Sequence, residues 1–462
     1  MSYSSLATHH SPLMIARRDF LLSASAALLA QRFEFGAIAR PRPTQSQLDW
    51  QRDELALFLH FGVNTFTDRE WGDGSENPAI FAPTHLDARQ WARVARDAGA
   101  RVLILTAKHH DGFCLWPTKT TSHSVASSPW RSGQGDVVRE LVDACRAQAL
   151  GVGLYLSPWD RNAPSYGDSP RYNDFYCAQL TELLTQYGPL RELWFDGANG
   201  EGPNGRHQVY DWPRIWGLVR RHQPEAVIFS DAGPDVRWIG NERGIAAETN
   251  WSPVDPAAVP YPGASGDAVM EMLQHGDPRG SVWRPGETDV SIRPGWFYHP
   301  AEDERVKPVD DLVELYFSSV GRNSKLLLNV PPTPAGLLHE RDAANLLAAR
   351  RRLTSLFAED LAAGRRASWR PTGNRTAVLE IDVGRSRKVA IADLREDVAR
   401  GQRVARYTLT GSDGGAWQPL ARGTTIGFRR LVRFTPTAIR RVRLTIEDAV
   451  ATPARVALGL YG

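Results

Sequence analysis

Short apolar runs alternate with amphipathic helical segments through most of the first 330 residues, and this alternation limits the possible folds more than any other feature. Residues 102–105 and 152–156 are apolar at nearly every position, whereas residues 88–98 and 137–145 repeat apolar side chains at helical spacing. Strands that are apolar on both faces are typical of a parallel sheet covered by helices. Roughly eight such runs over roughly 300 residues favour a (β/α)8-like barrel.

The expected elements leave one irregular stretch. Residues 233–300 are rich in Pro and Gly, so we expect long loops there and a distorted barrel. The expected strands are residues 55–63, 102–105, 152–156, 193–195, 227–229 and 326–328, and the expected helices are residues 88–98, 137–145, 175–187, 215–219, 312–320 and 337–357.

The pattern changes after this region. Residues 441–447 alternate strictly between polar and apolar side chains, residues 406–410 do the same, and a turn signal at 412–415 separates the two runs. Such alternation indicates half-buried antiparallel strands. We therefore expect two domains, an α/β barrel over residues 44–358 and an antiparallel β-sandwich over residues 366–462.

The first 39 residues are typical of a twin-arginine export signal. Arg17 and Arg18 precede Phe20 and Leu21, an apolar run follows, and residues 37–39 offer a small-x-small cleavage site. We expect removal after Ala39 and a periplasmic or secreted protein. The alternative is a chance arginine pair before a short helix.

Composition excludes several classes of function. A formal charge of +3 over 462 residues does not indicate a nucleic-acid surface. Outside the signal no apolar run is long enough to span a bilayer, so no membrane partner is expected after signal removal. The cysteines at 114, 145 and 177 lie far apart and are odd in number, which fits neither a disulfide framework nor a metal site.

Polar and aromatic side chains follow the expected strands where each one ends. His60 ends the first strand, the pair His109 and His110 ends the second, Tyr155 lies in the third, and Asp196 ends the fourth. In a parallel barrel these ends meet on one face, which is where active sites lie. We therefore expect one site there, with Glu70 and Trp71 close to it and Asp231 at the end of the fifth strand.

The consecutive residues His109, His110 and Asp111 leave three interpretations open. Metal ligands usually have spaced positions, and adjacent residues on a strand point to opposite faces. The pair therefore suits hydrogen bonding to a polyol better than metal binding, with purely structural histidines as the third possibility.

Several motifs, in order, resemble glycoside hydrolase family 29, the retaining α-L-fucosidases. KHHDGF (108–113) and ELWFDG (192–197) are the most specific, and the resemblance spans roughly residues 50–357. The segment PDVRWIGNE (234–242) further resembles the subfamily that cleaves branched α-1,3- and α-1,4-linked fucose. The other motifs are LFLHFGVNTF (57–66), REWG (69–72), GLYLSPWD (153–160) and GRNSKLLLNVPP (321–332).

The resemblance implies roles for particular residues. Asp196 matches the family's nucleophile and Glu242 the subfamily's acid/base, which we favour over Glu248. An arginine often follows the fifth-strand aspartate in relatives; here Ala232 does, so we expect Arg237 to replace it. The implied substrate-binding residues are His60, Glu70, Trp71, His109, His110, Tyr155, Trp194, Arg237 and Trp296.

The implied activity is release of L-fucose from a fucosylated oligosaccharide or glycoprotein glycan, with no cofactor and no metal. Retention requires two carboxyl groups, one that attacks and one that supplies and then takes up a proton. The alternatives are a fucosidase of broad linkage specificity, a metal-dependent hydrolase using His60, His109, His110 and Asp196, and a lectin without catalysis. We expect the β-sandwich to pack against the barrel rather than to bind glycans.

Overall fold

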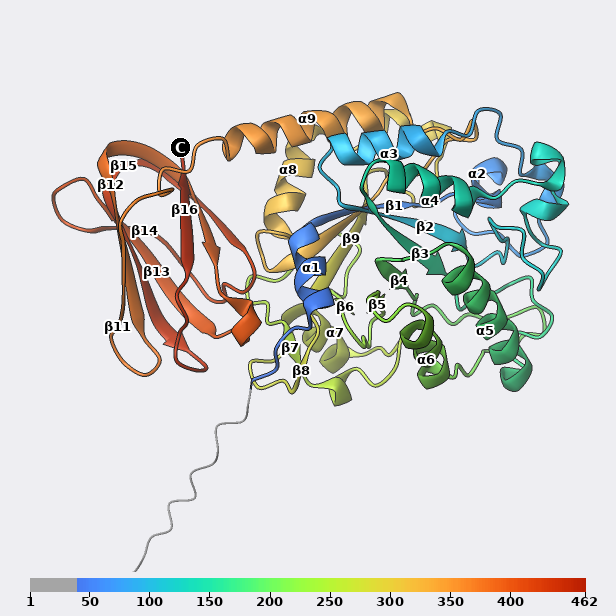
Figure 1. Ribbon diagram of the computed structural model, residues 1–462, viewed down its shortest axis with the longest axis horizontal. Coiled ribbons are helices and arrows are strands. Elements are labelled where there is room, and N and C mark those ends of the chain that lie inside the picture. The colour runs from blue at the N-terminus through green and yellow to red at the C-terminus, as the bar shows by residue number, and fades with distance from the viewer. Residues whose placement is uncertain (1–39) are drawn as a thin grey trace, which may run out of the picture. The chain divides into compact units, whose positions relative to one another are not determined.

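The protein contains a parallel barrel, as the sequence predicts. The computed structural model describes residues 40–462 (Figure 1). Eight strands run in the order β5-β4-β3-β2-β1-β10-β9-β6, and a single parallel bridge between Phe229 and Val236 brings the two edges together. The strands are β1 (Leu55–Leu59), β2 (Val102–Lys108), β3 (Gly151–Leu156), β4 (Glu192–Trp194), β5 (Val227–Phe229), β6 (Arg237–Trp238), β9 (Gly286–Ser291) and β10 (Ser324–Asn329).

The strands are apolar because they are buried on both faces. Leu57 pairs with Leu103 on one side and Leu328 on the other, and all seven residues of β2 are buried. Covering helices follow the strands, and aspartates start several of them: Asp87 and Asp136 accept hydrogen bonds from the first-turn amides of α3 and α4. The helices are α1 (Gln45–Asp53), α2 (Val63–Thr67), α3 (Ala88–Asp97), α4 (Val137–Ala147), α5 (Ser169–Gln186), α6 (Trp212–His222), α7 (Asp267–His275), α8 (Val309–Ser318) and α9 (Glu340–Leu356).

A cluster of charged groups lies among the apolar side chains inside the barrel, below the strand ends. Lys325 Nζ lies 2.7 Å from Glu192 Oε2 and 3.4 Å from Glu287 Oε2, and none of the three side chains is exposed to solvent. A buried ammonium group needs such partners because desolvation alone would be prohibitive. Trp194 Nε1 donates to Glu287 at 3.0 Å, so this cluster also supports the floor of the cavity described below.

The stretch 233–300 is more ordered than the sequence suggests. It supplies two barrel strands that periodicity did not reveal, β6 and β9, as well as α7 and a small antiparallel pair, β7 (Pro253–Val254) with β8 (Val282–Trp283). A strand of two residues carries no measurable period, and β9 (GETDVS) has few apolar side chains. The expectation of loops was therefore wrong for these two strands.

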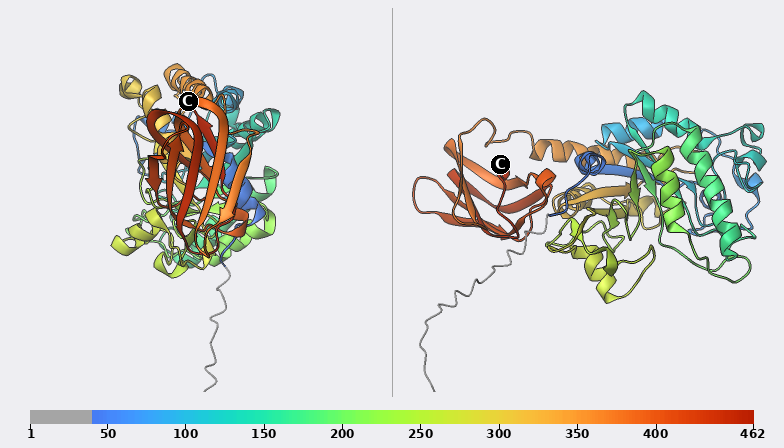
Figure 2. Two further views of the ribbon diagram at one scale, coloured as in Figure 1. Left: turned by 90° about the vertical axis from the view of Figure 1, so that its left-hand side faces the viewer. Right: turned by 60° about the horizontal axis from the view of Figure 1, so that its bottom comes forward.

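The C-terminal region is antiparallel, as expected. Its strands pair in the order β11-β12-β15-β13-β14, with β16 against β12. These strands are the group coloured orange to red in Figure 2. The two longest strands pass through register shifts and enclose a separate apolar core. The strands are β11 (Ala367–Pro371), β12 (Ala377–Arg395), β13 (Val404–Ser412), β14 (Gln418–Gly423), β15 (Arg430–Ala449) and β16 (Ala457–Tyr461).

Two other expectations concern the termini and the cysteines. The export signal lies at residues 1–39, outside the residues that the structure describes. From residue 40 onward, no helix is long and apolar enough to cross a bilayer. Cys114, Cys145 and Cys177 are all buried free thiols.

Candidate active site

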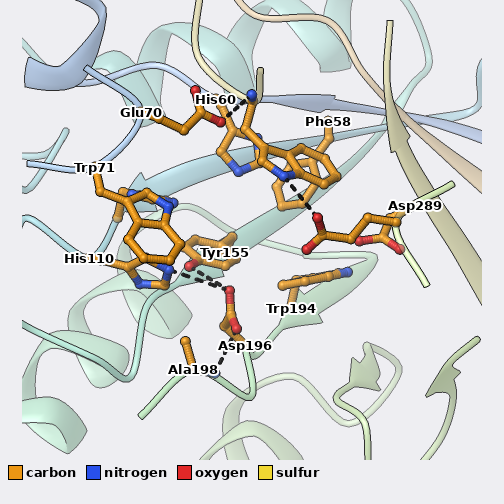
Figure 3. Close-up of a pocket in the computed structure, with 13 residues that line it drawn as sticks. Phe58, His60, Glu70, Trp71, His110, Tyr155, Trp194, Asp196, Ala198 and Asp289 are labelled. Atoms are coloured by element: carbon orange, nitrogen blue, oxygen red, sulfur yellow. Dashed lines mark hydrogen bonds and ion pairs between the residues drawn. The ribbon is translucent and has the colours of Figure 1, made fainter. Parts of the chain in front are cut away.

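A cavity of about 350 Å3 opens at the carboxyl ends of the barrel strands (Figure 3). Figure 3 shows Asp196 between one side formed by His110 and Trp71 and another formed by Trp194 and Asp289. The lining combines carboxylates, histidines and aromatic rings, a combination that suits a sugar. The lining residues are Phe58, His60, Glu70, Trp71, His109, His110, Tyr155, Trp194, Asp196, Ala198, Glu242, Asp289 and Trp296.

His60 has a defined hydrogen-bonding role because of its neighbour Asn329. The Asn329 amide donates to Ser291 Oγ at 2.9 Å and to the Trp296 carbonyl at 2.8 Å, so its oxygen faces His60. His60 Nδ1 lies 2.8 Å from that oxygen and must carry the proton. Burial lowers the pKa of His60 to about 3. The ring is therefore neutral, and its Nε2 is a hydrogen-bond acceptor.

His110 reaches the same state through a different partner. Ser157 Oγ uses its only proton on the Trp159 carbonyl at 2.6 Å, so it accepts from His110 Nδ1 at 2.7 Å. The bare Nε2 of His110 lies 3.9 Å from Asp196 Oδ2. The His109 and His110 rings are 4.2 Å apart, and burial lowers the pKa of both. Two acceptor nitrogens, one each from His60 and His110, are thus fixed in the lining of the cavity.

Asp196 lies two residues beyond β4 and is held at both oxygens. Tyr155 donates to Oδ2 at 3.1 Å, and the backbone amide of Ala198 donates to Oδ1 at 2.7 Å. Gly197 is required by space, since a Cβ there would lie 2.3 Å from Asp231 Oδ2. This close packing holds the backbone that carries Asp196, and the two donors fix the orientation of its carboxyl group.

Glu70 is both a lining residue and the anchor of the segment that carries Trp296. Its carboxylate accepts from the backbone amides of Trp296 and Phe297, the latter at 3.3 Å. His299 Nε2 lies 2.9 Å from Glu70, and its Nδ1 lies 2.7 Å from Asp68. Burial lowers the pKa of His299, but these two partners reverse the effect and leave it above its ordinary value.

Three tryptophans form the aromatic surfaces of the cavity. Trp71 is 57% exposed and meets the His110 ring edge-on at 6.0 Å. Trp194 is buried and stacks on Phe229 with the centroids 4.2 Å apart. The Trp296 ring lies 5.1 Å from the His60 ring. Flat apolar faces at the rim and the floor leave space for a sugar ring between them.

Glu242 faces this cavity, whereas Glu248 does not line it. Trp296 Nε1 donates to Glu242 Oε2 at 3.4 Å. Although Glu242 remains exposed at the rim, partial burial raises its pKa, the Trp296 N–H opposes this, and the charges of Asp196 and Glu70 add to the rise. Glu248 instead pairs with Arg322 at 2.5 Å and with Arg430.

Arg237 lies outside the cavity, contrary to the expectation that it contacts the sugar. Its side chain is fully buried in β6, where Nε donates to the Leu273 carbonyl at 3.0 Å and Nη2 to Asn250 Oδ1 at 2.8 Å. Nη1 donates to the Arg284 carbonyl. Every nitrogen of the guanidinium group therefore has a structural partner, and nothing in the local sequence around Arg237 revealed this.

The cavity also contains residues that the sequence analysis missed. Phe58 lies on β1, two residues before His60, and Ala198 donates its backbone amide to Asp196. The most notable is Asp289, a carboxyl that is only 4% exposed and that points inward from β9. The sequence feature that could have revealed Asp289 is the alternation of Glu287, Asp289 and Ser291 along one face of β9. This alternation is recognisable only once β9 is known to be a strand.

The metal alternative requires several ligand side chains arranged around one point. Within residues 40–462, no group of three or more His, Cys, Asp or Glu side chains is arranged to hold a metal ion. The Nδ1 atoms of His60 and His110 instead have Asn329 and Ser157 as partners.

Comparisons with known proteins identify the family. The family profile described as alpha-L-fucosidase matches residues 35–351. Alpha-L-fucosidase 1 of Arabidopsis thaliana is 44% identical over 91% of this chain and 87% of its own length. The chain belongs to the α-L-fucosidase family. A putative alpha-L-fucosidase 1 of Oryza sativa subsp. japonica is 43% identical, over 91% of this chain and 85% of its own.

Solved structures agree with this assignment to glycoside hydrolase family 29. A family 29 member from an unknown rumen bacterium is 42% identical with a TM-score of 0.84, covering 92% of this chain and 77% of its own. A family 29 fucosidase of Ruminococcus gnavus, solved in complex with fucose, is 31% identical with a TM-score of 0.82, covering 92% and 96%. The enzyme is therefore a glycoside hydrolase that acts on fucosylated glycans.

Proposed function

We propose that the enzyme releases L-fucose by double displacement, with Asp196 as nucleophile and Glu242 as acid/base. The observation that carries this proposal is that the two carboxyl groups line one cavity in unlike environments. Asp196 accepts hydrogen bonds from Tyr155 and from the Ala198 amide, whereas partial burial and neighbouring charges raise the pKa of Glu242. Such a division between paired carboxyls separates a nucleophile from an acid.

The chemical steps follow from this division. Asp196 attacks the anomeric carbon, the bond to the leaving oxygen breaks, and Glu242 transfers its proton to that oxygen. The product is a covalent fucosyl-enzyme and a free acceptor. Glu242, now a carboxylate, takes a proton from water, the resulting oxygen attacks the same carbon, and Asp196 leaves. Two inversions give net retention.

The neutral histidines would act on the sugar hydroxyls. The bare Nε2 atoms of His60 and His110 accept hydrogen bonds, and a hydroxyl group is a donor. His110 Nε2 lies near Asp196. A sugar hydroxyl bound to His110 Nε2 is therefore close to the anomeric carbon and shifts as that carbon reacts. Such a contact tightens as charge develops in the transition state.

The test of the nucleophile uses Asp196→Ala. We expect turnover to fall by several orders of magnitude because the covalent route is lost. The melting temperature should fall only modestly, since the Asp196 side chain is partly exposed and the change costs only the hydrogen bonds from Tyr155 and Ala198. Added azide should restore part of the cleavage and yield the β-fucosyl azide, detected by NMR. Near-normal turnover, or azide rescue giving the α-anomer, would overturn the assignment.

For linkage we propose a preference for α-1,3- and α-1,4-linked fucose on branched acceptors. Support comes from the segment PDVRWIGNE and from the rim of the cavity. Gly263 packs against the Gly197 backbone, and its amide donates to Asp231 at 2.9 Å, so residues 261–264 lie beside the nucleophile segment. Tyr261 in this segment is 58% exposed, and Trp71, on another part of the rim, is 57% exposed. Exposed aromatic faces suit an acceptor sugar.

The linkage proposal is tested by three substrates. The value of kcat/KM should be highest for a Lewis-type trisaccharide, lower for a linear α-1,2-fucosylated trisaccharide, and lowest for a simple aryl fucoside, because acceptor contacts contribute to the transition state. Equal or better cleavage of the last two would indicate broad specificity and leave the fucosidase assignment intact. Tyr261→Ala should reduce the differences in kcat/KM between the three substrates, whereas Val209→Ala, at another exposed apolar residue, should leave these differences unchanged and is the control.

Export through the twin-arginine route remains a proposal that rests on residues 17–39 of the sequence. Replacing Arg17 and Arg18 with lysines should leave the protein in the cytoplasm if the signal is used. Fractionation of cells that express both versions would measure this, and equal export would contradict it.

A further inference from the structure

The acid/base candidate Glu242 lies on a short loop whose two ends are both fixed to strand β9. At the start of the loop, the backbone amide of Ile239 donates to the Glu287 carbonyl at 3.0 Å. At its end, the amide of Gly244 donates to the Asp289 carbonyl at 3.1 Å. The orientation of Glu242 therefore depends on this part of β9 rather than on a strand of its own.

Asp289 makes a second contact with the same loop through its side chain. Its Oδ1 accepts from Trp238 Nε1 at 2.7 Å, and Trp238 is the last residue before the loop begins. One residue thus holds the loop at both ends, by its carboxyl group at Trp238 and by its carbonyl at Gly244. The backbone at Gly244 also packs closely against β9: its φ is +69°, and a Cβ added there would lie 2.7 Å from Val290 Cγ1.

The remaining oxygen of Asp289 belongs to the cavity. The residue is 4% exposed and lines the cavity together with Glu242, and among the described residues none donates a hydrogen bond to its Oδ2. Burial raises the pKa of Asp289 well above its ordinary value, and the charge of Glu242 is the next largest cause. A neutral Asp289 accepts the Trp238 N–H without placing a second full charge beside Glu242.

We propose that Asp289 is a positioning residue for Glu242, holding the acid/base loop at Trp238 and Gly244 so that the Glu242 carboxyl reaches the leaving oxygen. This inference rests on the proposed role of Glu242. It assigns Asp289 to the proton-transfer part of the site and predicts that its loss affects leaving groups that need protonation most.

The experiment measures kcat/KM for a series of aryl α-L-fucosides whose leaving phenols differ in acidity. Simple phenols avoid differences in acceptor recognition, and a displaced general acid steepens the dependence on phenol acidity. For Asp289→Ala we expect a loss of about 100-fold with the least acidic phenol, the size of effect that a misplacement near 1 Å produces, and of no more than about 5-fold with the most acidic.

Conservative variants separate positioning from general damage. Asp289→Asn keeps an oxygen acceptor for Trp238 and stays neutral, so it should remain within about 3-fold of the wild type across the series. Trp238→Phe removes only the donor and should steepen the dependence in the same direction, though less. Thr288→Val is the matched control: it removes a buried hydrogen bond of 2.8 Å on the same strand and should lower kcat/KM equally, if at all, for every phenol.

Three results would overturn the proposal: equal losses across the series for Asp289→Ala, a steepened dependence for Thr288→Val, or damage by Asp289→Asn as large as that by Asp289→Ala. Glu242→Ala measured in parallel keeps the two claims separate. If that variant shows no steepening, Glu242 is not the acid and the proposed function fails at that residue. If it does steepen and Asp289→Ala does not, only the positioning role is wrong.

Discussion

The two sides of the cavity are built in different ways. On the side of β1 to β4, most lining groups lie within two residues of a strand end, as His60, His110 and Asp196 do, and most are buried. On the other side, Glu242 lies four residues beyond a strand of only two residues, is exposed, and has one long hydrogen bond from Trp296. The first side holds a sugar in fixed geometry, while the second side depends on contacts between loops.

Removing Glu242 should give the largest contrast between the two sides. We expect Glu242→Ala to lower kcat/KM for a natural oligosaccharide by roughly 10²- to 10⁴-fold, the usual contribution of a general acid. A fucoside with a very acidic phenol needs little protonation and should lose far less. Steady-state kinetics on both substrates measure the contrast.

Glu248→Ala is the control because Glu248 is paired with Arg322 and Arg430 and does not line the cavity. It should lower stability without any dependence on the leaving group. If Glu248→Ala shows the leaving-group pattern and Glu242→Ala does not, the acid/base assignment is reversed.

The same contrast explains how far the sequence could predict the site. His60, His109, His110, Tyr155 and Asp196 were found because each lies at or just beyond a strand with a clear apolar pattern, and strand ends converge in any parallel barrel. Both the barrel and the C-terminal antiparallel sheet could be predicted because most of their strands show clear hydrophobic periodicity. The resemblance to family 29 supplied the roles, and for Glu242 and Trp296 it also supplied the positions.

What could not be predicted depends on contacts between distant residues. Arg237 was expected in the cavity, but its donors are taken by Leu273, Arg284 and Asn250, which lie 13 to 47 residues further along the chain. Asp289 was missed because β9 has polar residues facing inward, where their partners are on other strands. No local pattern carries that information.

The histidine side should respond to mutation in a different way. We expect His60→Ala to lower kcat/KM by about 10- to 100-fold, because one hydrogen bond to a sugar hydroxyl and the fixed Asn329 contact are lost, about 1–3 kcal/mol. The loss should be equal for phenols of every acidity, since His60 does not act on the leaving oxygen. Kinetics on the same aryl series measure it.

His123→Ala provides the matched control, since His123 is an equally buried histidine that does not line the cavity. We expect its kcat/KM to stay near the wild-type value while its melting temperature falls. A leaving-group dependence in His60→Ala would show that the two sides of the cavity do not act separately.

The smallest expected effect is a shift in pH dependence, and it tests the Trp296–Glu242 contact. Burial raises the pKa of Glu242, the Trp296 N–H lowers it, and the charges of Asp196 and Glu70 raise it. Trp296→Phe removes the only one of these effects that lowers the pKa, so the pKa of Glu242 should rise. Because the acid must be protonated in the first step, activity is lost as pH rises through this pKa. The basic limb of kcat/KM should therefore move to higher pH, by less than about one unit since the bond is long.

Trp71→Phe, which removes a lining indole that has no bond to Glu242, should leave the limb in place even if it weakens sugar binding. A shift of the Trp296→Phe limb to lower pH would mean that water entering the site, rather than the lost N–H, controls the proton affinity of Glu242.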